Sequence, residues 1–296
     1  MKNIMTTSAY CKEVFGEKLY KLSLSAATSC PNRAGGKSGC IFCSAGGSGE
    51  FSAPSYLPVE EQIEQARRRV QNKYKGERFI AYFQSYTGTY GEIEQLRKIY
   101  LTAARRSDIA AVSIATRPDC LGSEVMDMLS ELAARKPLWI ELGLQTQNDQ
   151  SAHHMGRGYP FSEYVTATQK LRALPVHIIT HVILGLPGEN KEQMLRSVAA
   201  AGEHSDGLKL QLLHVLENTP LAQLYRQGKV SVLEPEAYYD IVASALEQLP
   251  EGKVIHRLTG DGDKRILLAP MWSADKKRVM NDLYRCLKER GMEVRT

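Results

Sequence analysis

Apolar segments that alternate with helical patterns constrain the fold of this chain more than any other feature of its sequence. Four of these segments contain the runs IAYF, IAAVSIA, LWIELGL and VHIITHVILGL, which begin at Ile80, Ile109, Leu138 and Val176. Strands with so few polar residues are typical of a parallel sheet that is buried on both faces and covered by helices. The sequence therefore predicts an α/β fold.

Hydrophobic periodicity assigns six strand–helix units along the chain. The predicted strands are Leu19–Ser25, Phe79–Tyr86, Ile109–Ala115, Leu138–Leu144, Val176–Leu184 and Leu208–Leu216. The predicted helices are Val59–Lys75, Glu92–Arg105, one that opens at Ser123 as its N-cap, Ser162–Leu174, one after Gly188, and Pro235–Leu249. Six units make a partial (β/α)6 TIM-like barrel, because a closed barrel of this type needs eight.

The C-terminal tail does not supply the two missing units. It offers only short strands near Ile255 and at Ile266–Leu268, followed by a final helix. We expect residues 1–250 to form the barrel and residues 251–296 to form a basic C-terminal extension packed on it. Such barrels bind ligands at the C-terminal ends of their strands, so the loops that follow the strands are the candidate binding regions.

The composition agrees with one domain of barrel size, since the chain has 296 residues, of which 43% are hydrophobic and 24% charged. The N-terminal sequence MKNIMTTSAYCKEVFGEKLY has no apolar run of signal-peptide length. No segment approaches the ~20 apolar residues of a membrane span. We therefore expect a cytoplasmic protein without membrane contact.

Positive charge is concentrated at the C-terminus. Residues Lys264–Thr296 contain nine basic and four acidic residues, so the rest of the chain balances at 29 and 29. Such a segment is either a solvated helix face or a phosphate contact. If a polyanion binds, helical spacing favours contacts from Lys276, Lys277, Arg278, Arg285 and Lys288. The same helix can pack through Met280, Leu283 and Leu287 against the open edge of the barrel.

Three cysteines form the strongest candidate site. Cys30, Cys40 and Cys43 follow the first predicted strand with nine and two residues between them, in a loop rich in glycine. Glycine lets the backbone wrap closely around an inorganic centre and leaves N–H groups to bond to sulfide or ligand. Thiolates bind iron–sulfur clusters and zinc alike, but three cysteines without a nearby histidine leave one coordination position open.

Other interpretations of the cysteines remain open at this point. Cys11 could complete a structural zinc site with these three, or the thiols could be unligated. Cys120 and Cys286 lie in or beside helical patterns and are interpreted as packing thiols. Six cysteines in so long a chain are too sparse for a disulfide scaffold.

With these motifs the sequence resembles the radical SAM superfamily, in the branch related to the catalytic subunit of Elongator, and within it the YhcC/YtqA-like family. The resemblance runs from Leu19 to Leu249. It rests on CPNRAGGKSGCIFCSAGGSGEF, ATRPD, ELGLQT, MGRGYPF and ILGLPGE, in that order. It implies that Cys30, Cys40 and Cys43 hold a [4Fe-4S] cluster. It further implies that an electron donor such as flavodoxin or ferredoxin drives reductive cleavage of S-adenosyl-L-methionine (SAM) to methionine and a 5′-deoxyadenosyl radical.

The resemblance also assigns SAM contacts residue by residue. Gln145 matches a contact to the ribose, Arg157 a contact to the carboxylate, and Ile183 and Gly185 contacts to adenine. The alternatives without a functional role are a strand-end cap for Gln145 and an ordinary surface arginine for Arg157.

Some positions depart from the family's pattern. The family's Gly-Gly-Glu element is replaced here by residues 84–88, which begin with Gln84 and whose backbone carbonyls we expect to serve SAM. His181 stands where the family has a glycine, and Glu189 lies one residue later than expected. Thr116 and Arg117 are expected to face the same mouth, with pairing across the sheet as the alternative.

No side chain is assigned a catalytic role. His153, His154, His177, His181 and His214 are interpreted as satisfied core or near-strand histidines. The resemblance favours modification of a tRNA wobble uridine side chain, although no RNA-binding motif or aromatic platform is evident. The alternatives are radical chemistry on a small metabolite such as a porphyrin precursor, and a metal-binding RNA-interaction module without turnover.

Overall fold

A nine-stranded sheet forms the centre of the molecule, and every pairing between its strands is parallel. The computed structural model describes residues 2–26, 29–37, 39–47, 49, 51–260 and 262–295. Ser38, Ser48 and Glu50 of the cysteine motif, and Thr296, lie outside the described residues. In sheet order the strands are β11 (Met292–Arg295), β1 (Lys2–Thr6), β9 (Val254–Arg257), β7 (Gly207–Leu212), β6 (Val176–Leu184), β5 (Leu138–Gln145), β4 (Ile109–Thr116), β3 (Phe79–Phe83) and β2 (Tyr20–Leu24).

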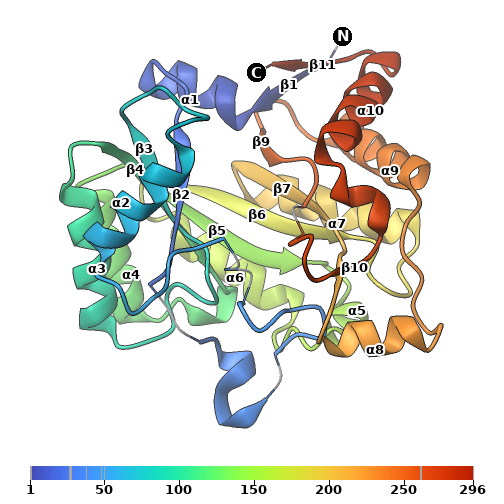
Figure 1. Ribbon diagram of the computed structural model, residues 1–296, viewed down its shortest axis with the longest axis horizontal. Helices are drawn as coiled ribbons and strands as arrows, with labels where there is room; N and C mark the ends of the chain where they lie inside the picture. Colours follow the sequence, from blue (N-terminus) through green and yellow to red (C-terminus); the bar gives the residue numbers. More distant parts are fainter. Residues whose placement is uncertain are drawn as a thin grey trace.

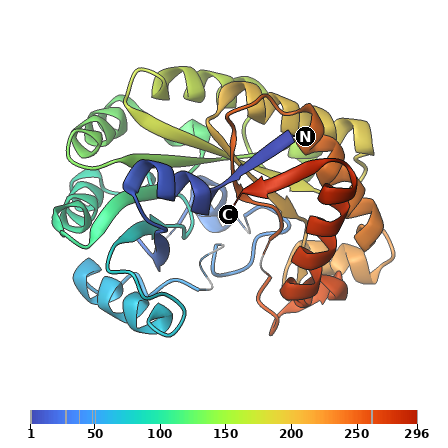
Figure 2. The ribbon, with the colours of Figure 1, turned by 90° about the horizontal axis from the view of Figure 1, so that it is seen from above.

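Helices cover the outside of this sheet, which curves around an interior space (Figure 1). Seen from above, the helices form an arc that runs from α2 at one end to α10 at the other (Figure 2). The helices are α1 (Thr7–Phe15), α2 (Val59–Val70), α3 (Ile93–Arg105), α4 (Ser123–Ala133), α5 (Asp149–His154), α6 (Phe161–Leu171), α7 (Lys191–His204), α8 (Pro220–Arg226), α9 (Pro235–Gln248) and α10 (Lys276–Glu289). None of the described helices is long and apolar enough to cross a membrane.

The predicted partial barrel is confirmed, and six of its strands are the six that hydrophobic periodicity identified. The predicted strand Leu208–Leu216 is divided into β7 and the short β8 (Val215–Leu216), which pairs antiparallel with β10 (Leu267–Ala269). Instead of two further strand–helix units, β9, β1 and β11 extend the sheet beyond β7. The chain termini therefore meet in neighbouring strands, with Lys2 opposite Met292 (Figures 1 and 2).

Local differences from the predicted helices have simple causes. The predicted N-cap at Ser123 is wrong, because Gly122 occupies the cap and Ser123 is the first helical residue. The helix expected over Glu92–Arg105 begins one residue later, because the Glu92 carboxylate caps it by accepting the N–H groups of Glu94 and Gln95.

The interior of the barrel is closed at the amino ends of the strands by an apolar cluster. Its buried residues come from four adjacent strands, β3 to β6, from α1 and from the residue before β2: Ile80, Ala110, Ala111, Trp139, Ile179, Cys11 and Leu19. The larger core lies between the sheet and the surrounding helices and includes Leu283 and Leu287 of α10. The predicted packing of α10 through these two leucines is confirmed, with Val279 as its third fully buried residue and Met280 only partly buried.

Candidate functional site

A cavity of about 1280 Å³ opens at the carboxyl ends of the barrel strands. It brings together most residues that the sequence marked as candidates. Seven of them line it: Cys30, Cys40, Cys43, Gln84, Gln145, Arg157 and Ile183. Gly185 is not among the described residues that line the cavity; its position lies against Leu233, whose side chain would contact an added Cβ at 3.1 Å.

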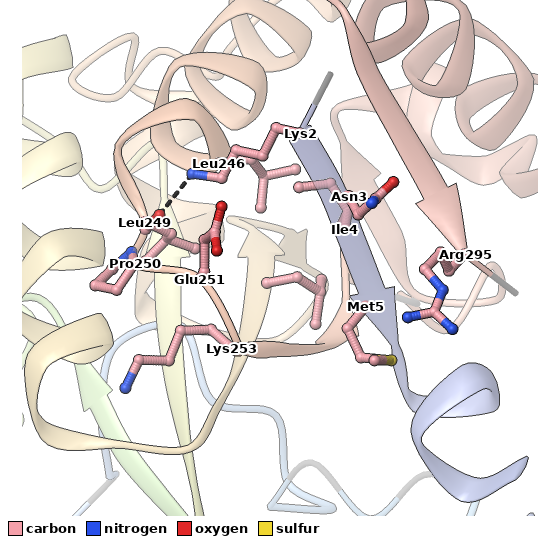
Figure 3. A pocket seen from close by; sticks show the side chains of 12 residues that line it. Lys2, Asn3, Ile4, Met5, Leu246, Leu249, Pro250, Glu251, Lys253 and Arg295 are labelled. Carbon is pink, nitrogen blue, oxygen red and sulfur yellow. Dashed lines mark hydrogen bonds between the residues drawn. The ribbon is translucent and has the colours of Figure 1, made fainter. Parts of the chain in front are cut away.

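A smaller hollow of about 220 Å³ lies at β1 and the segment that precedes β9 (Figure 3). Its lining includes Lys2, Glu251, Lys253 and Arg295, and the Lys2 ammonium donates to the carbonyl of Leu249. None of the described residues in its lining is a cysteine or histidine. The larger cavity is therefore the candidate site.

The three cysteines lie on one short loop. Cys30 precedes a 3-10 helix, Pro31–Gly36, and a turn joins the N–H of Cys43 to the carbonyl of Cys40 at 2.9 Å. Burial raises the pKa of the Cys40 thiol to about 11, and the charges of Cys43 and Cys30 act in the same direction, so the three sulfurs influence one another. Ligation by iron would have to remove this proton, because thiolates and not thiols bind metals.

No group of three His, Cys, Asp or Glu side chains among the described residues could hold a single metal ion. The thiolates of a four-iron cluster each bind a different iron, so they need not converge on one point.

The segment after α5 supports the cysteine loop. Asn32 donates its side-chain amide to the Cys40 sulfur at 3.2 Å and to the carbonyls of Gly156 and Arg157 at 2.7 and 2.9 Å. Ile41 donates its N–H to the carbonyl of Met155 at 3.1 Å. Only glycine fits at position 158, because its φ is +86° and a Cβ there would lie 2.6 Å from the Asn32 side chain. The MGRGYPF motif therefore serves to dock the cysteine loop.

The end of β3 holds the other side of the same loop. Tyr86 donates its backbone N–H to the carbonyl of Gly47 at 2.8 Å and its hydroxyl to the carbonyl of Ala45 at 2.7 Å. Arg33 donates to the carbonyl of Cys43 at 3.2 Å and lies over the Tyr86 ring. Residues 84–88, which replace the family's Gly-Gly-Glu element, thus contact the cysteine loop directly.

Gln145 presents a buried polar atom to the cavity. It ends β5 with φ of +66°, a left-handed conformation that is uncommon and strained for a residue other than glycine. Its side-chain oxygen is buried and has no hydrogen-bond partner among the described residues. A buried acceptor without a partner costs free energy, and such atoms in native proteins call for an explanation such as a missing ligand.

Arg157 lies nearby, fully buried. Its guanidinium donates to the carbonyls of Tyr159, Leu144 and Thr146 and forms an ion pair with Asp149 at 2.9 Å. The surface-arginine alternative is therefore wrong. In this structure Arg157 holds the chain after β5 in place, and a contact to a SAM carboxylate stays a prediction.

Other predicted positions around the mouth have clear structural roles. Thr116 and Arg117 both line the cavity, and Arg117 forms an ion pair with Asp119 at 2.6 Å and lies over the Tyr159 ring. Glu189 accepts from the Thr146 hydroxyl at 2.6 Å.

Two of the remaining cysteines, Cys11 and Cys286, lie apart from the three in the loop. Cys11 is completely buried in the apolar cluster at the amino ends of the strands. It therefore cannot complete a site with Cys30, Cys40 and Cys43 in this structure, and that alternative is overturned. Cys286 packs against the core from α10.

Sequence analysis missed a layer of charged residues inside the barrel. Glu141 of β5 is completely buried and accepts from Lys21 at 2.8 Å, from Ser113 at 2.7 Å, from His181 at 2.8 Å and from Lys209. Burial acts to raise the pKa of Glu141, but the two ammonium groups and His181 hold it well below its usual range.

Burial and the charge of Lys209 together lower the pKa of His181 to about 4, so the histidine of this layer is neutral near pH 7. Glu141, His181 and Lys21 all line the cavity, so His181 is more than a core histidine. The signal for this layer was present in the sequence: single charged residues interrupt the apolar strands LWIELGL and GLKLQL.

An exposed aromatic ring also lies at the mouth. Phe51 lines the cavity with 51% of its surface exposed, and Arg69 of α2 donates to its carbonyl at 3.2 Å.

Two family models together match most of the chain. The model of the Radical SAM superfamily matches residues 27–201, and the model of the Radical_SAM C-terminal domain matches residues 205–289. YtqA of Bacillus subtilis is 37% identical over 293 residues, which cover 98% of this chain and 91% of YtqA. The tRNA uridine(34) acetyltransferase of Methanocaldococcus jannaschii is 24% identical over 208 residues, 69% of this chain and 37% of that protein.

Among solved structures, an archaeal Elp3 from Methanocaldococcus infernus superimposes with a TM-score of 0.67 at 16% identity. The match covers 80% of this chain and 60% of that one, and it concerns the fold alone. The extent of the superfamily match and the identity to YtqA confirm the resemblance that the motifs indicated. The chain belongs to the radical SAM superfamily, whose members bind a [4Fe-4S] cluster and SAM.

Proposed function

We propose that this protein holds a [4Fe-4S] cluster through Cys30, Cys40 and Cys43 and cleaves SAM reductively at the iron without a protein ligand. Three features support a fit to these groups. The donor set consists of three mutually interacting thiols, it opens into the large cavity, and Asn32 supplies a hydrogen bond to one sulfur. Such hydrogen bonds to cluster sulfurs tune the reduction potential.

The unpartnered oxygen of Gln145 supports a ligand with hydroxyl groups at the end of β5. In the proposed arrangement Gln145 accepts from the SAM ribose, Arg157 meets the carboxylate, and Ile183 and Gly185 flank adenine. Gln84 begins the segment whose carbonyls receive the amino group. When bound, the cluster and SAM supply a 5′-deoxyadenosyl radical after one-electron reduction by a donor such as flavodoxin or ferredoxin.

Within the protein, the chain's own residues orient the substrate and exclude water. The apolar cluster at the amino ends of the strands closes the barrel below the cavity. A substrate would therefore enter the cavity from the carboxyl ends of the strands.

For the substrate we propose a tRNA wobble uridine side chain. The observation that carries this proposal is the charge of the cavity: its described lining contains ten basic residues and two acidic ones. Five of the basic residues are exposed at the rim, namely Arg69, Lys73, Lys264, Arg265 and Lys276. A rim of this kind suits a substrate with several phosphates, since each neutralised phosphate releases counterions.

The rim joins two distant parts of the chain. Arg69 comes from α2 and Lys73 follows it, whereas Lys264, Arg265 and Lys276 belong to the basic C-terminal segment. Phe51 also lines the cavity, next to Arg69, and offers a face on which a base can stack, a contact worth about 1–3 kcal/mol in single-stranded nucleic acid complexes. The likeness to a tRNA uridine(34) acetyltransferase supports the same substrate class.

Nucleoside analysis of tRNA tests the proposal. We expect tRNA from a strain that lacks the gene to lose one modified wobble uridine, and the parent gene to restore it. A variant with Cys40→Ser should fail to restore it, while Cys286→Ser should succeed. An unchanged nucleoside profile, with no affinity of the protein for tRNA, would favour a small metabolite as substrate.

A further inference from the structure

One arginine inside the barrel has no acidic partner among the residues that the structure describes. Arg257 ends β9 and lines the large cavity. The register between β7 and β9 is irregular here, with Leu208 opposite Ile255 but Lys209 opposite Arg257. An irregularity of this kind re-aims side chains, and it brings Arg257 beside the charged layer.

The carboxylate of that layer is already saturated. Each oxygen of Glu141 accepts two hydrogen bonds, one oxygen from Lys21 and Ser113, the other from His181 and Lys209. A carboxylate offers about four acceptor positions, so none is left for Arg257. Lys21, Lys209 and Arg257 thus share the layer with the carboxylate of Glu141, and burial lowers the pKa of Lys209 well below its usual range, with the charges of Lys21 and Arg257 acting in the same direction.

Three other arginines of the cavity have an acidic partner, and Arg33 and Arg69 donate to backbone carbonyls instead. Arg117, Arg157 and Arg265 form ion pairs with Asp119, Asp149 and Asp263 at 2.6 to 2.9 Å. Among the described residues no carboxylate lies within ion-pair distance of Arg257, whose one side-chain contact is the amide oxygen of Gln211 at 3.4 Å. A guanidinium carries five N–H donors, so most of the donors of Arg257 are available to a ligand in the cavity.

A directed chain of hydrogen bonds positions this arginine. His181 donates through Nε2 to Glu141 at 2.8 Å, and its Nδ1 then accepts from the amide nitrogen of Gln211 at 3.3 Å. The amide oxygen of Gln211 is thereby turned toward Arg257. The ionised Glu141 thus orients the His181 ring, and His181 in turn orients the Gln211 amide. The series of hydrogen bonds ends at the Arg257 guanidinium.

We propose that Arg257 is the centre of an oxyanion subsite at the inner end of the cavity, which binds a carboxylate or phosphate of the substrate. A guanidinium matches both groups with two parallel hydrogen bonds, and the ammonium group of Lys21 in the same layer also favours an anion. The inference deepens the proposed function and rests on it for the identity of the cavity as the reaction chamber. A phosphate would come from the nucleotide that enters the barrel, and a carboxylate from a small co-substrate.

Calorimetric binding to the cluster-loaded protein without SAM or reductant tests the subsite. The probes are uridine 5′-monophosphate, succinate and, as the neutral reference, uridine. We expect the parent to bind one of the two anions at least about tenfold more tightly than uridine, and the preferred anion identifies the source. Arg257→Gln should lose at least about tenfold in affinity for that anion.

Two further variants keep the result interpretable. Arg257→Lys keeps the charge but loses the two-pronged geometry, so it should bind more weakly than the parent and more tightly than Arg257→Gln. Arg135→Gln removes a charge outside the barrel, where Arg135 pairs with Glu131, and should bind as the parent does. If Arg257→Gln does not fold, the comparison of Arg257→Lys with the parent decides.

Equal affinity of the parent and the Arg257 variants would overturn the subsite, as would a parent that binds neither anion. Because no step of this measurement uses SAM, that failure would leave SAM cleavage and tRNA modification untouched. Conversely, anion binding at Arg257 in a protein that does not cleave SAM would overturn the proposed function and retain the subsite.

Discussion

The side-chain amide of Asn32 donates to the sulfur of Cys40 at 3.2 Å. The same nitrogen lies 2.7 and 2.9 Å from the carbonyls of Gly156 and Arg157, so one residue joins the cysteine loop to the segment after α5. Asn32 thereby fixes the loop of the proposed cluster relative to Arg157, one of the proposed SAM contacts.

Removal of this amide should shift the reduction potential of the cluster. A hydrogen bond to a cysteine sulfur stabilises the reduced, more negative cluster, so Asn32→Ala should make the potential more negative while iron remains bound. A redox titration followed by electron paramagnetic resonance measures this. Asn190→Ala, which removes the N-cap of α7, serves as the control and should leave the potential unchanged. A parental potential in Asn32→Ala would contradict the role of the contact.

Gln145 and Arg157 should respond differently to alanine. Gln145→Ala should weaken SAM binding about five- to tenfold with little change in the free energy of unfolding, because the oxygen that it removes has no partner among the described residues. Arg157→Ala removes one buried donor from three carbonyls and from Asp149 and should lower that free energy by about 3 kcal/mol. Binding titrations and urea unfolding separate the two effects. Parental SAM affinity in Gln145→Ala would remove that residue from the proposed site.

Stability should fall as the pH drops below about 6.5. Burial lowers the pKa of His177 and of His181 from 6.5 to about 4, so between these values the unfolded chain binds protons that the folded chain does not. The free energy of unfolding should therefore decrease from pH 7 to pH 5, by up to about 2 kcal/mol for each histidine. Urea midpoints of the cluster-free protein measure this. His181→Gln should reduce the slope, and the exposed His153→Gln should not; a flat profile in the parent would contradict the burial of these rings.

The basic rim should determine how tRNA binding depends on salt. Replacement of Lys264, Arg265 and Lys276 by Gln should flatten the slope of log affinity against log salt by up to about 2 units. The control triple of Lys277, Arg285 and Lys288 removes as many charges from α10 at positions outside the cavity lining, and it should change the slope less. Equal slopes for the two triple variants would show that the cavity mouth is not the part of the protein that binds tRNA.

This prediction revises the segment that sequence analysis favoured. Lys276 lines the mouth, whereas Arg278 and Arg285 of the same helix are not among the described residues of the lining. Helical spacing placed these cations on one helix correctly. It could not show which of them face the cavity, because that depends on how α10 packs on α9.

The central strands could be predicted because strands buried on both faces are apolar almost throughout, as in IAAVSIA of β4. The strands β1 and β11 could not, because KNIMT and MEVR are short, partly polar and pair only with strands far away in the sequence. Their pairing follows from the tertiary fold and leaves no local pattern.

The same distinction holds for the site. The spacing of Cys30, Cys40 and Cys43 is local and was readable, as was Gln145 within its motif. The inner charged layer required the register of several strands, and Arg257 lines the cavity beside an irregular pairing that no local pattern marks. Charged residues in apolar strands, such as Glu141 and Lys209, were the available clue.

The measurement that tests the account most directly is the release of 5′-deoxyadenosine from SAM by the anaerobically reconstituted, reduced protein. The parent should load the iron–sulfur cluster and release methionine and 5′-deoxyadenosine. Single changes of Cys30, Cys40 or Cys43 to Ser should abolish both the iron–sulfur absorbance and the product, because three thiolates are needed to hold the cluster. Cys120→Ser and Cys286→Ser should retain both. A fully loaded parent that releases no 5′-deoxyadenosine, or normal iron content in all three loop variants, would contradict the account.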